Sequence, residues 1–103
     1  MTDWKVKQWT RGKTKIFTID DSDGTNVNIS GYTLILSAWR GDTTLFSGAC
    51  TIVSGTIGGC LYVLKSGDVS TPGPYSFEIQ MGISGVVEYT DTYTLQVQGV
   101  SPR

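Results

Sequence analysis

The 103-residue chain contains no histidine, only two cysteines and no long apolar run. The lack of histidine removes the commonest general base and every Ser-His or Cys-His nucleophile pair. Two cysteines without histidine cannot supply a four-ligand zinc site unaided. The longest apolar run, Cys60 to Leu64, is far shorter than the roughly 20 residues of a membrane-spanning helix. We therefore expect neither an enzyme nor a membrane protein, and no cofactor or metal.

Charge is also scarce, because charged residues make up 17% of the chain and the net charge is −1. Such a chain has no general attraction to nucleic acid or to anionic membranes. The first residues show no apolar stretch after their charges, so we expect no secretory signal and synthesis in a cytoplasm. In that compartment Cys50 and Cys60 are expected to be free, partly buried thiols, although a bridge closing a small loop stays open.

What the sequence does contain is apolar alternation of period two, interrupted by glycine-rich turns roughly every 8–12 residues, which is typical of β-sandwiches and barrels. No helix is predicted. The predicted strand segments are 4–9, 15–20, 27–29, 32–40, 43–46, 49–53, 60–64, 75–81, 86–89 and 92–100. Segment 32–40 is the clearest central strand, segment 43–46 is expected at an edge, and 65–73 is expected to be a polar loop. The short connections predict one antiparallel domain over 1–103, with a flexible tail at 101–103.

The acidic residues do not form a convincing site. Asp21 and Asp23 before Gly24 suggest a calcium loop, but the positions where its first and last ligands belong hold Ile19 and Ser30. The segment is better explained as a solvated hairpin turn. The only glutamates, Glu78 and Glu88, are predicted to face outward from strands, so they do not form the carboxylate pair of a glycosidase.

The basic and aromatic residues leave more alternatives open. Five basic residues cluster near the start of the chain: Lys5, Lys7, Arg11, Lys13 and Lys15. They could guard an edge strand against aggregation, contact an acidic neighbour protein or, least favoured, bind nucleic acid. Trp4 is predicted in the core. Trp9 and Trp39 are predicted on faces away from the core, where indoles serve protein interfaces or carbohydrate stacking. Trp9, Trp39 and Lys13 are therefore the candidate interface residues.

The segment Gly73-Pro74-Tyr75 lies at the entrance to a late alternating strand. Sandwich domains often place a tyrosine there, and its hydroxyl bonds back to nearby backbone to form a structural corner. The same chain carries, in order, Arg11-Gly12-Lys13-Thr14, the turn at 21–25, the segment 27–34 and the terminal strand segment 92–97. This order of motifs resembles the immunoglobulin-like domains of tailed-phage virion proteins. It is most similar to the N-terminal domain of upper baseplate proteins, over roughly residues 10–98.

That resemblance implies an all-β, immunoglobulin-like antiparallel β-sandwich of about seven to eight strands. It also implies a non-enzymatic structural protein of a phage or prophage virion, in the tail, the baseplate or the capsid surface. The expected partners are other virion structural proteins and further copies of the chain, with no nucleic acid or membrane. The alternative is a carbohydrate-binding or adhesive module that uses its exposed tryptophans. Two departures stand out: Asn28-Ile29-Ser30-Gly31 replaces the usual Asp-Leu-Thr-Gly, and the two-cysteine stretch has no counterpart in the family.

Overall fold

The computed structural model describes residues 3–20 and 25–99. The expected turn at 21–24 and the expected tail at 101–103 lie outside these ranges. The strands are β1 (Trp4–Lys7), β2 (Thr14–Thr18), β3 (Thr33–Arg40), β4 (Thr43–Ser54), β5 (Gly59–Val63), β6 (Gly73–Ile83), β7 (Val86–Tyr89) and β8 (Tyr93–Gln98), with one 3-10 turn, η1 (Gly55–Ile57), between β4 and β5. The expected all-β fold is confirmed. No helix of the described chain is long and apolar enough to cross a membrane.

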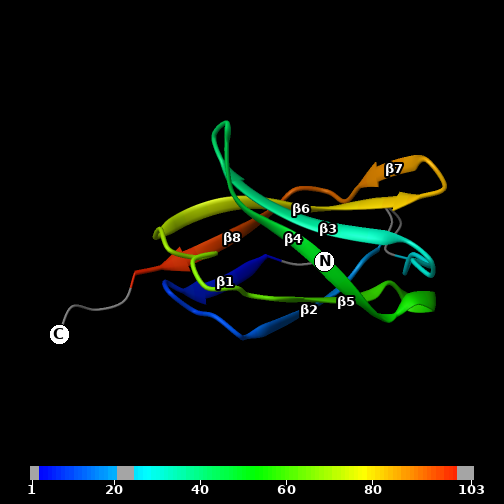
Figure 1. Ribbon diagram of the computed structural model, residues 1–103, viewed down its shortest axis with the longest axis horizontal. Coiled ribbons are helices and arrows are strands. Elements are labelled where there is room, and N and C mark those ends of the chain that lie inside the picture. The colour runs from blue at the N-terminus through cyan, green and yellow to red at the C-terminus, as the bar shows by residue number, and fades with distance from the viewer. Residues whose placement is uncertain (1–2, 21–24, 100–103) are drawn as a thin grey trace.

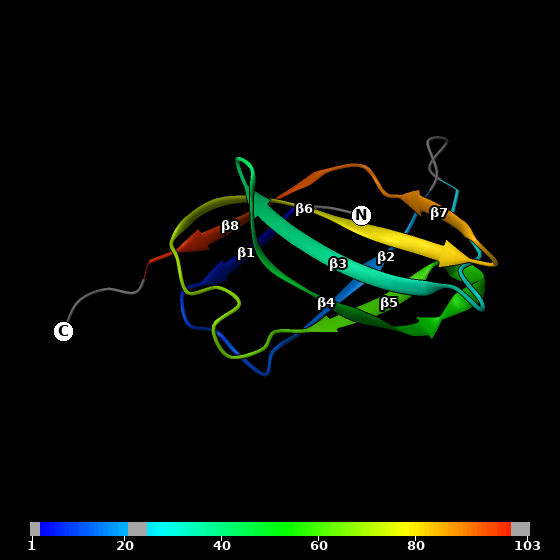
Figure 2. The same ribbon diagram turned by 45° about the horizontal axis from the view of Figure 1, so that its top comes forward.

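The strands follow one another laterally in the order β1-β8-β6-β3-β4-β5-β2, and β7 pairs separately with β6. Figures 1 and 2 show this path curling so that β2 and β5 lie below β3 and β6. The long strand β4 belongs to both layers, because its first part pairs with β3 and its last part with β5. The path begins at β1 and ends at β2, so the curled sheet is left open between two strands that are adjacent in sequence.

The alternation of apolar residues correctly predicts the inward faces of β3 and β6. Leu34, Leu36 and Ala38 of β3 are buried, as predicted. The predicted inward set of β6 is buried as well, and it contains Tyr75, Phe77, Ile79 and Met81. A residue on such a face alternates with outward neighbours because successive side chains of a strand point to opposite sides. The core therefore lies between the two layers.

Aromatic rings close the core beneath the gap between β1 and β2. Trp4 packs edge-on against Phe17 at 5.7 Å and against Phe77 at 6.1 Å between ring centroids. Trp4 is buried, so its predicted place in the core is confirmed. Since edge-to-face pairs each add roughly 0.5–1.5 kcal/mol beyond their buried area, this cluster ties β1 to β2 through side chains, although the two strands share no ladder.

The prediction of a short edge strand at 43–46, separate from 49–53, is wrong. One twelve-residue strand, β4, covers both segments and lies between β3 and β5. Gly48 interrupts the apolar pattern without ending the strand. A Cβ at Gly48 would lie 2.9 Å from the Tyr62 ring, so this glycine provides room for close packing and not a turn.

Two further differences concern pairing. β1 runs parallel to β8, with Trp4 opposite Leu95, so the sheet is mixed and not wholly antiparallel. The segment 27–29 forms no strand; Asp20 and Asn26 form an isolated bridge, and Ile29 is buried beyond it. The expected hairpin at 49–64 and the return strand at 86–89 are both present.

The loop before β6 is more than a polar connection. Val69 is fully buried, and the buried Asp68 accepts hydrogen bonds from the Tyr62 hydroxyl (2.7 Å) and the Lys65 N–H (2.9 Å). Burial, followed by the bond to Asp68, raises the pKa of Tyr62 above its usual value. The loop is thus anchored to β5 by a buried polar contact that compensates for the desolvated carboxylate.

Candidate protein-docking site

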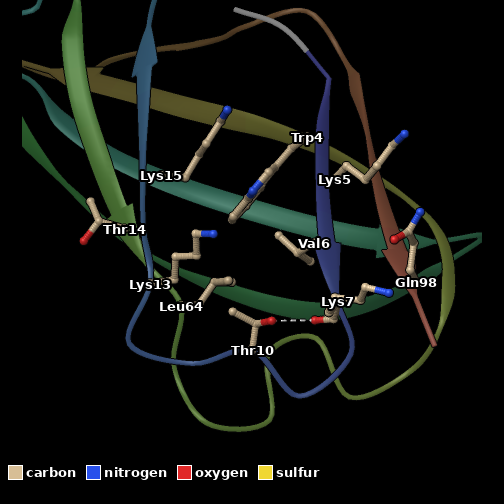
Figure 3. A pocket seen from close by; sticks show the side chains of 10 residues that line it. All are labelled: Trp4, Lys5, Val6, Lys7, Thr10, Lys13, Thr14, Lys15, Leu64 and Gln98. Atoms are coloured by element: carbon tan, nitrogen blue, oxygen red, sulfur yellow. Dashed lines mark hydrogen bonds between the residues drawn. The ribbon is translucent and has the colours of Figure 1, made fainter. Parts of the chain in front are cut away.

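A groove of about 470 Å³ lies between β1 and β2, where the curled sheet is open. It is lined by Trp4, Lys5, Val6, Lys7, Thr10, Lys13, Thr14, Lys15, Leu64 and Gln98. Figure 3 shows Trp4 and Val6 pointing from β1 toward β2, and Lys15 of β2 and Lys13, directly before β2, pointing toward β1. The floor of the groove is apolar because it is formed by side chains at the edge of the core, and lysines surround this floor.

The structure brings together four of the five clustered basic residues at this groove: Lys5, Lys7, Lys13 and Lys15. Arg11 is exposed in the preceding loop and does not line the groove. Lys15 is half-buried, and its Nζ lies 5.9 Å from the centroid of the Phe17 ring. Its aliphatic stem covers apolar surface while its charge stays near water, as long basic side chains commonly do. Lys13 of the predicted interface thus belongs to a basic groove.

The two candidate tryptophans do not join this site. The Trp9 side chain is 59% exposed and lies in the turn after β1, with a left-handed backbone (φ +68°). Trp39 lies on the outer side of β3, half-buried, at a bulge between Ala38 and Trp39. No ring contact joins Trp9 to Trp39 in the described structure, so they are separate surface features. Their assignment to an interface stays a prediction.

Tyr75 makes the contacts that the expected corner requires. Its hydroxyl donates a 2.6 Å hydrogen bond to the Thr71 carbonyl and accepts a 3.3 Å bond from the Thr71 N–H. Arg40 covers the Tyr75 ring at 4.9 Å and donates to the carbonyls of Pro72 and Pro74. This corner fixes the start of β6 against the loop before it.

The residues considered for catalysis or metal binding do not come together in the described structure. Glu78 lies half-buried on β6, where its carboxylate accepts a 3.5 Å bond from Thr92, and Glu88 is exposed on β7. Residues 3–20 and 25–99 contain no group of three His, Cys, Asp or Glu side chains that could hold a metal ion. Cys50 and Cys60 are free thiols in mutual contact. Their contact, followed by burial, raises the pKa of Cys50.

Sequence reasoning missed a second set of surface residues, which are exposed and apolar. Ile16 is 63% exposed on the outer side of β2, opposite Leu61 of β5, and Val63 of β5 is exposed as well. All four residues of β7 are exposed, with Val87 at 52% and Tyr89 at 57%. Alternation alone assigns such residues to one face or the other, but it does not tell which face a second layer covers. Exposed apolar side chains on free strand edges suit contact with another protein.

Comparison with known proteins agrees with this fold. No protein-family model and no curated protein matches the chain. Among solved structures, the N-terminal domain of phage TP901-1 ORF48 is similar, with a TM-score of 0.65 and 13% sequence identity, over 95% of this chain and 99% of that chain. The similarity to the N-terminal domain of upper baseplate proteins, expected from the motif order, is thereby confirmed at the level of the fold.

Proposed function

We propose that this chain is a non-enzymatic structural domain of a phage or prophage virion, which acts by docking to other virion proteins. The observation that carries the proposal is the fold match to a phage protein domain over 95% of the chain. The basic groove and the exposed apolar residues of β2 and β7 support it, because they offer contact surfaces to a protein partner. Tail, baseplate and capsid surface are all compatible locations.

The test is occupancy of the particle. Virions purified from the strain that carries this sequence are analysed by mass spectrometry and by immunogold labelling against the chain. We expect the chain in every particle at a fixed ratio to a known tail or capsid protein. Particles that assemble and infect without the chain would overturn the proposal. The position of the gold label distinguishes the tail, the baseplate and the capsid surface.

The exposure of Trp9 supports a second candidate function, carbohydrate binding. An indole that is 59% exposed offers a flat apolar face on which a sugar ring could stack. In that case a glycan array should give hits that Trp9→Ala removes and Trp39→Ala, the half-buried control, retains. An array without hits, together with unchanged tryptophan fluorescence on adding polysaccharide, would exclude this candidate.

A further inference from the structure

Three strands of the described chain, β1, β2 and β7, have an edge that pairs with no other strand, and β2 and β7 carry the opposite charges needed to meet. β1 and β2 end the lateral path of strands and face each other across the groove, and β7 pairs only with β6. Figure 1 shows β7 at the margin of the molecule. Unpaired edges are templates for pairing with another chain, so the orientation of their backbone groups decides what they can bind.

The hydrogen bonds of β2 show which residues point to its free edge. Two hydrogen bonds flank the ladder between β2 and β5. The Lys13 carbonyl accepts a bond from the Leu64 N–H (3.0 Å), and the Ile19 N–H donates a bond to the Gly58 carbonyl (2.9 Å). Bonding alternates along an antiparallel ladder, so odd-numbered residues bond to β5. Thr14, Ile16 and Thr18 therefore direct their N–H and C=O groups away from β5, toward the gap.

β7 shows the same alternation of its backbone hydrogen bonds. The Thr90 N–H donates a 3.0 Å bond to the Ile79 carbonyl, and the ladder continues with Met81 opposite Glu88. Even-numbered residues of β7 thus bond to β6, and Val87 and Tyr89 direct their backbone groups outward. Each free edge therefore offers backbone donors and acceptors at every second residue.

The side chains on the two edges are complementary. On β2, Ile16 lies on the outer side, and Lys15 points into the groove between β1 and β2. On β7, Val87 and Tyr89 share one side, and Glu88 lies on the other side with Met81. An antiparallel register with Val87 opposite Ile16 satisfies both edges, because residues with outward backbone groups then face each other. This register places Glu88 opposite Lys15.

The charges on the two strands favour this pairing over a non-specific contact. Four of the eight basic residues of the chain line the groove. Within the described ranges, neither Lys15 nor Glu88 forms an ion pair, so both charges are available to a partner. Opposite charges directly across a ladder stabilise it, and apolar pairs such as Val–Ile add to this. The alternative is that the lysines only protect the edge from aggregation, in which case they would bind no partner.

We propose that copies of this chain associate head to tail, with β7 of one copy adding as an antiparallel strand to the free edge of β2 of the next. The inference names one partner for the docking role proposed above and rests on that role. The contact of two short strands is small, so the association of isolated domains is weak and concentration-dependent. In a particle that holds copies side by side, a high local concentration compensates for this.

Sedimentation velocity over a concentration series of the purified chain tests the proposal. We expect reversible self-association that weakens as salt screens Lys15 and Glu88. Lys15→Glu and Glu88→Lys should each weaken association by about tenfold or more, because each places like charges opposite one another. The two single variants mixed together should associate with each other, and the double variant should recover near wild-type association. Arg11→Glu, which makes the same change of charge at an exposed residue that does not line the groove, is the control.

Backbone variants test the ladder itself. Ile16→Pro removes an N–H that points to the free edge, so it should abolish association and retain the β2–β5 ladder. Ile16→Thr controls for the lost side chain, and circular dichroism checks the fold. Amide exchange gives a readout independent of proline: the Thr14, Ile16, Thr18, Val87 and Tyr89 amides should gain protection with concentration, whereas Phe17, already bonded to β5, should not.

Three results would overturn the inference: a monomer at every concentration, association that the charge swap does not restore, or no gain in protection at these amides. Each of these can occur with the chain present in particles, which leaves the proposed function standing. Conversely, head-to-tail association of a chain that is absent from particles overturns the proposed function and supports the strand pairing.

Discussion

Removing one oxygen atom from Tyr75 tests whether the corner stabilises the domain. Tyr75→Phe deletes the 2.6 Å bond to the Thr71 carbonyl and the 3.3 Å bond from its N–H. The ring keeps its contacts, including Arg40 at 4.9 Å and Phe46 at 6.2 Å, so the apolar contribution is retained. A net value of roughly 0.5–1.5 kcal/mol per hydrogen bond predicts a loss of about 1–2 kcal/mol. Water limits the loss, because Thr71 is exposed.

The measurement is equilibrium unfolding in urea, with thermal unfolding as a second readout. A loss of about 1 kcal/mol lowers the Tm of a domain of this size by roughly 4–8 °C. The urea dependence of the unfolding free energy should stay unchanged, because the surface exposed on unfolding is the same. Tyr32→Phe is the control, since Tyr32 is half-buried and no hydrogen bond of its hydroxyl occurs in the described structure. If both variants unfold at the same urea concentration, the corner does not stabilise the fold and the reasoning is refuted.

Three other predictions concern the loop before β6, the residue between η1 and β5, and the core. Because burial and Asp68 raise the pKa of Tyr62, its contribution is fully present below about pH 10 and is lost as the pH rises further. Wild type should lose more stability than Tyr62→Phe over that rise in urea titrations. Gly58→Ala should cost more than about 1–2 kcal/mol by thermal unfolding, because Gly58 has φ +76° and a Cβ would overlap the Ile19 carbonyl. Phe77→Ala, at a fully buried site, should cost about 3–5 kcal/mol in urea; a smaller cost would show that the core refills.

The inward faces of β3 and β6 could be predicted because their burial has period two over seven or more residues. The same rule failed at β4, where Gly48 resembled a turn residue. Its role is set by Tyr62, fourteen positions later, whose ring leaves no room for a side chain. A glycine needed for a turn and one needed for close packing look alike in sequence, and only the tertiary neighbour separates them.

The candidate site was predictable in part for a similar reason. The lysines were recognisable as a cluster because they are close in sequence, and four of them line one groove. The groove itself depends on the parallel pairing of Trp4 with Leu95. Trp4 and Leu95 are some ninety positions apart, so the sequence of β1 carries no local signal that it lies next to β8. The exposure of Val87 and Tyr89 was likewise hidden, because alternation predicts one buried face for a strand, whereas β7 is exposed on both faces.

The difference between the two free edges determines what kind of assembly they can build. A contact between β2 and β7 uses two different surfaces, so it is heterologous. A chain of copies then keeps one unused edge, β2 or β7, at each of its two ends. Such a contact closes into a ring only if the rotation between neighbours divides a full turn; otherwise it continues as a filament. The strand pairing fixes the neighbour, and the twist of the joined sheet fixes that rotation. The mass of the assembly at high chain concentration therefore depends on the twist across the β2–β7 junction. A discrete mass indicates a closed ring, and unlimited growth indicates an open helical filament.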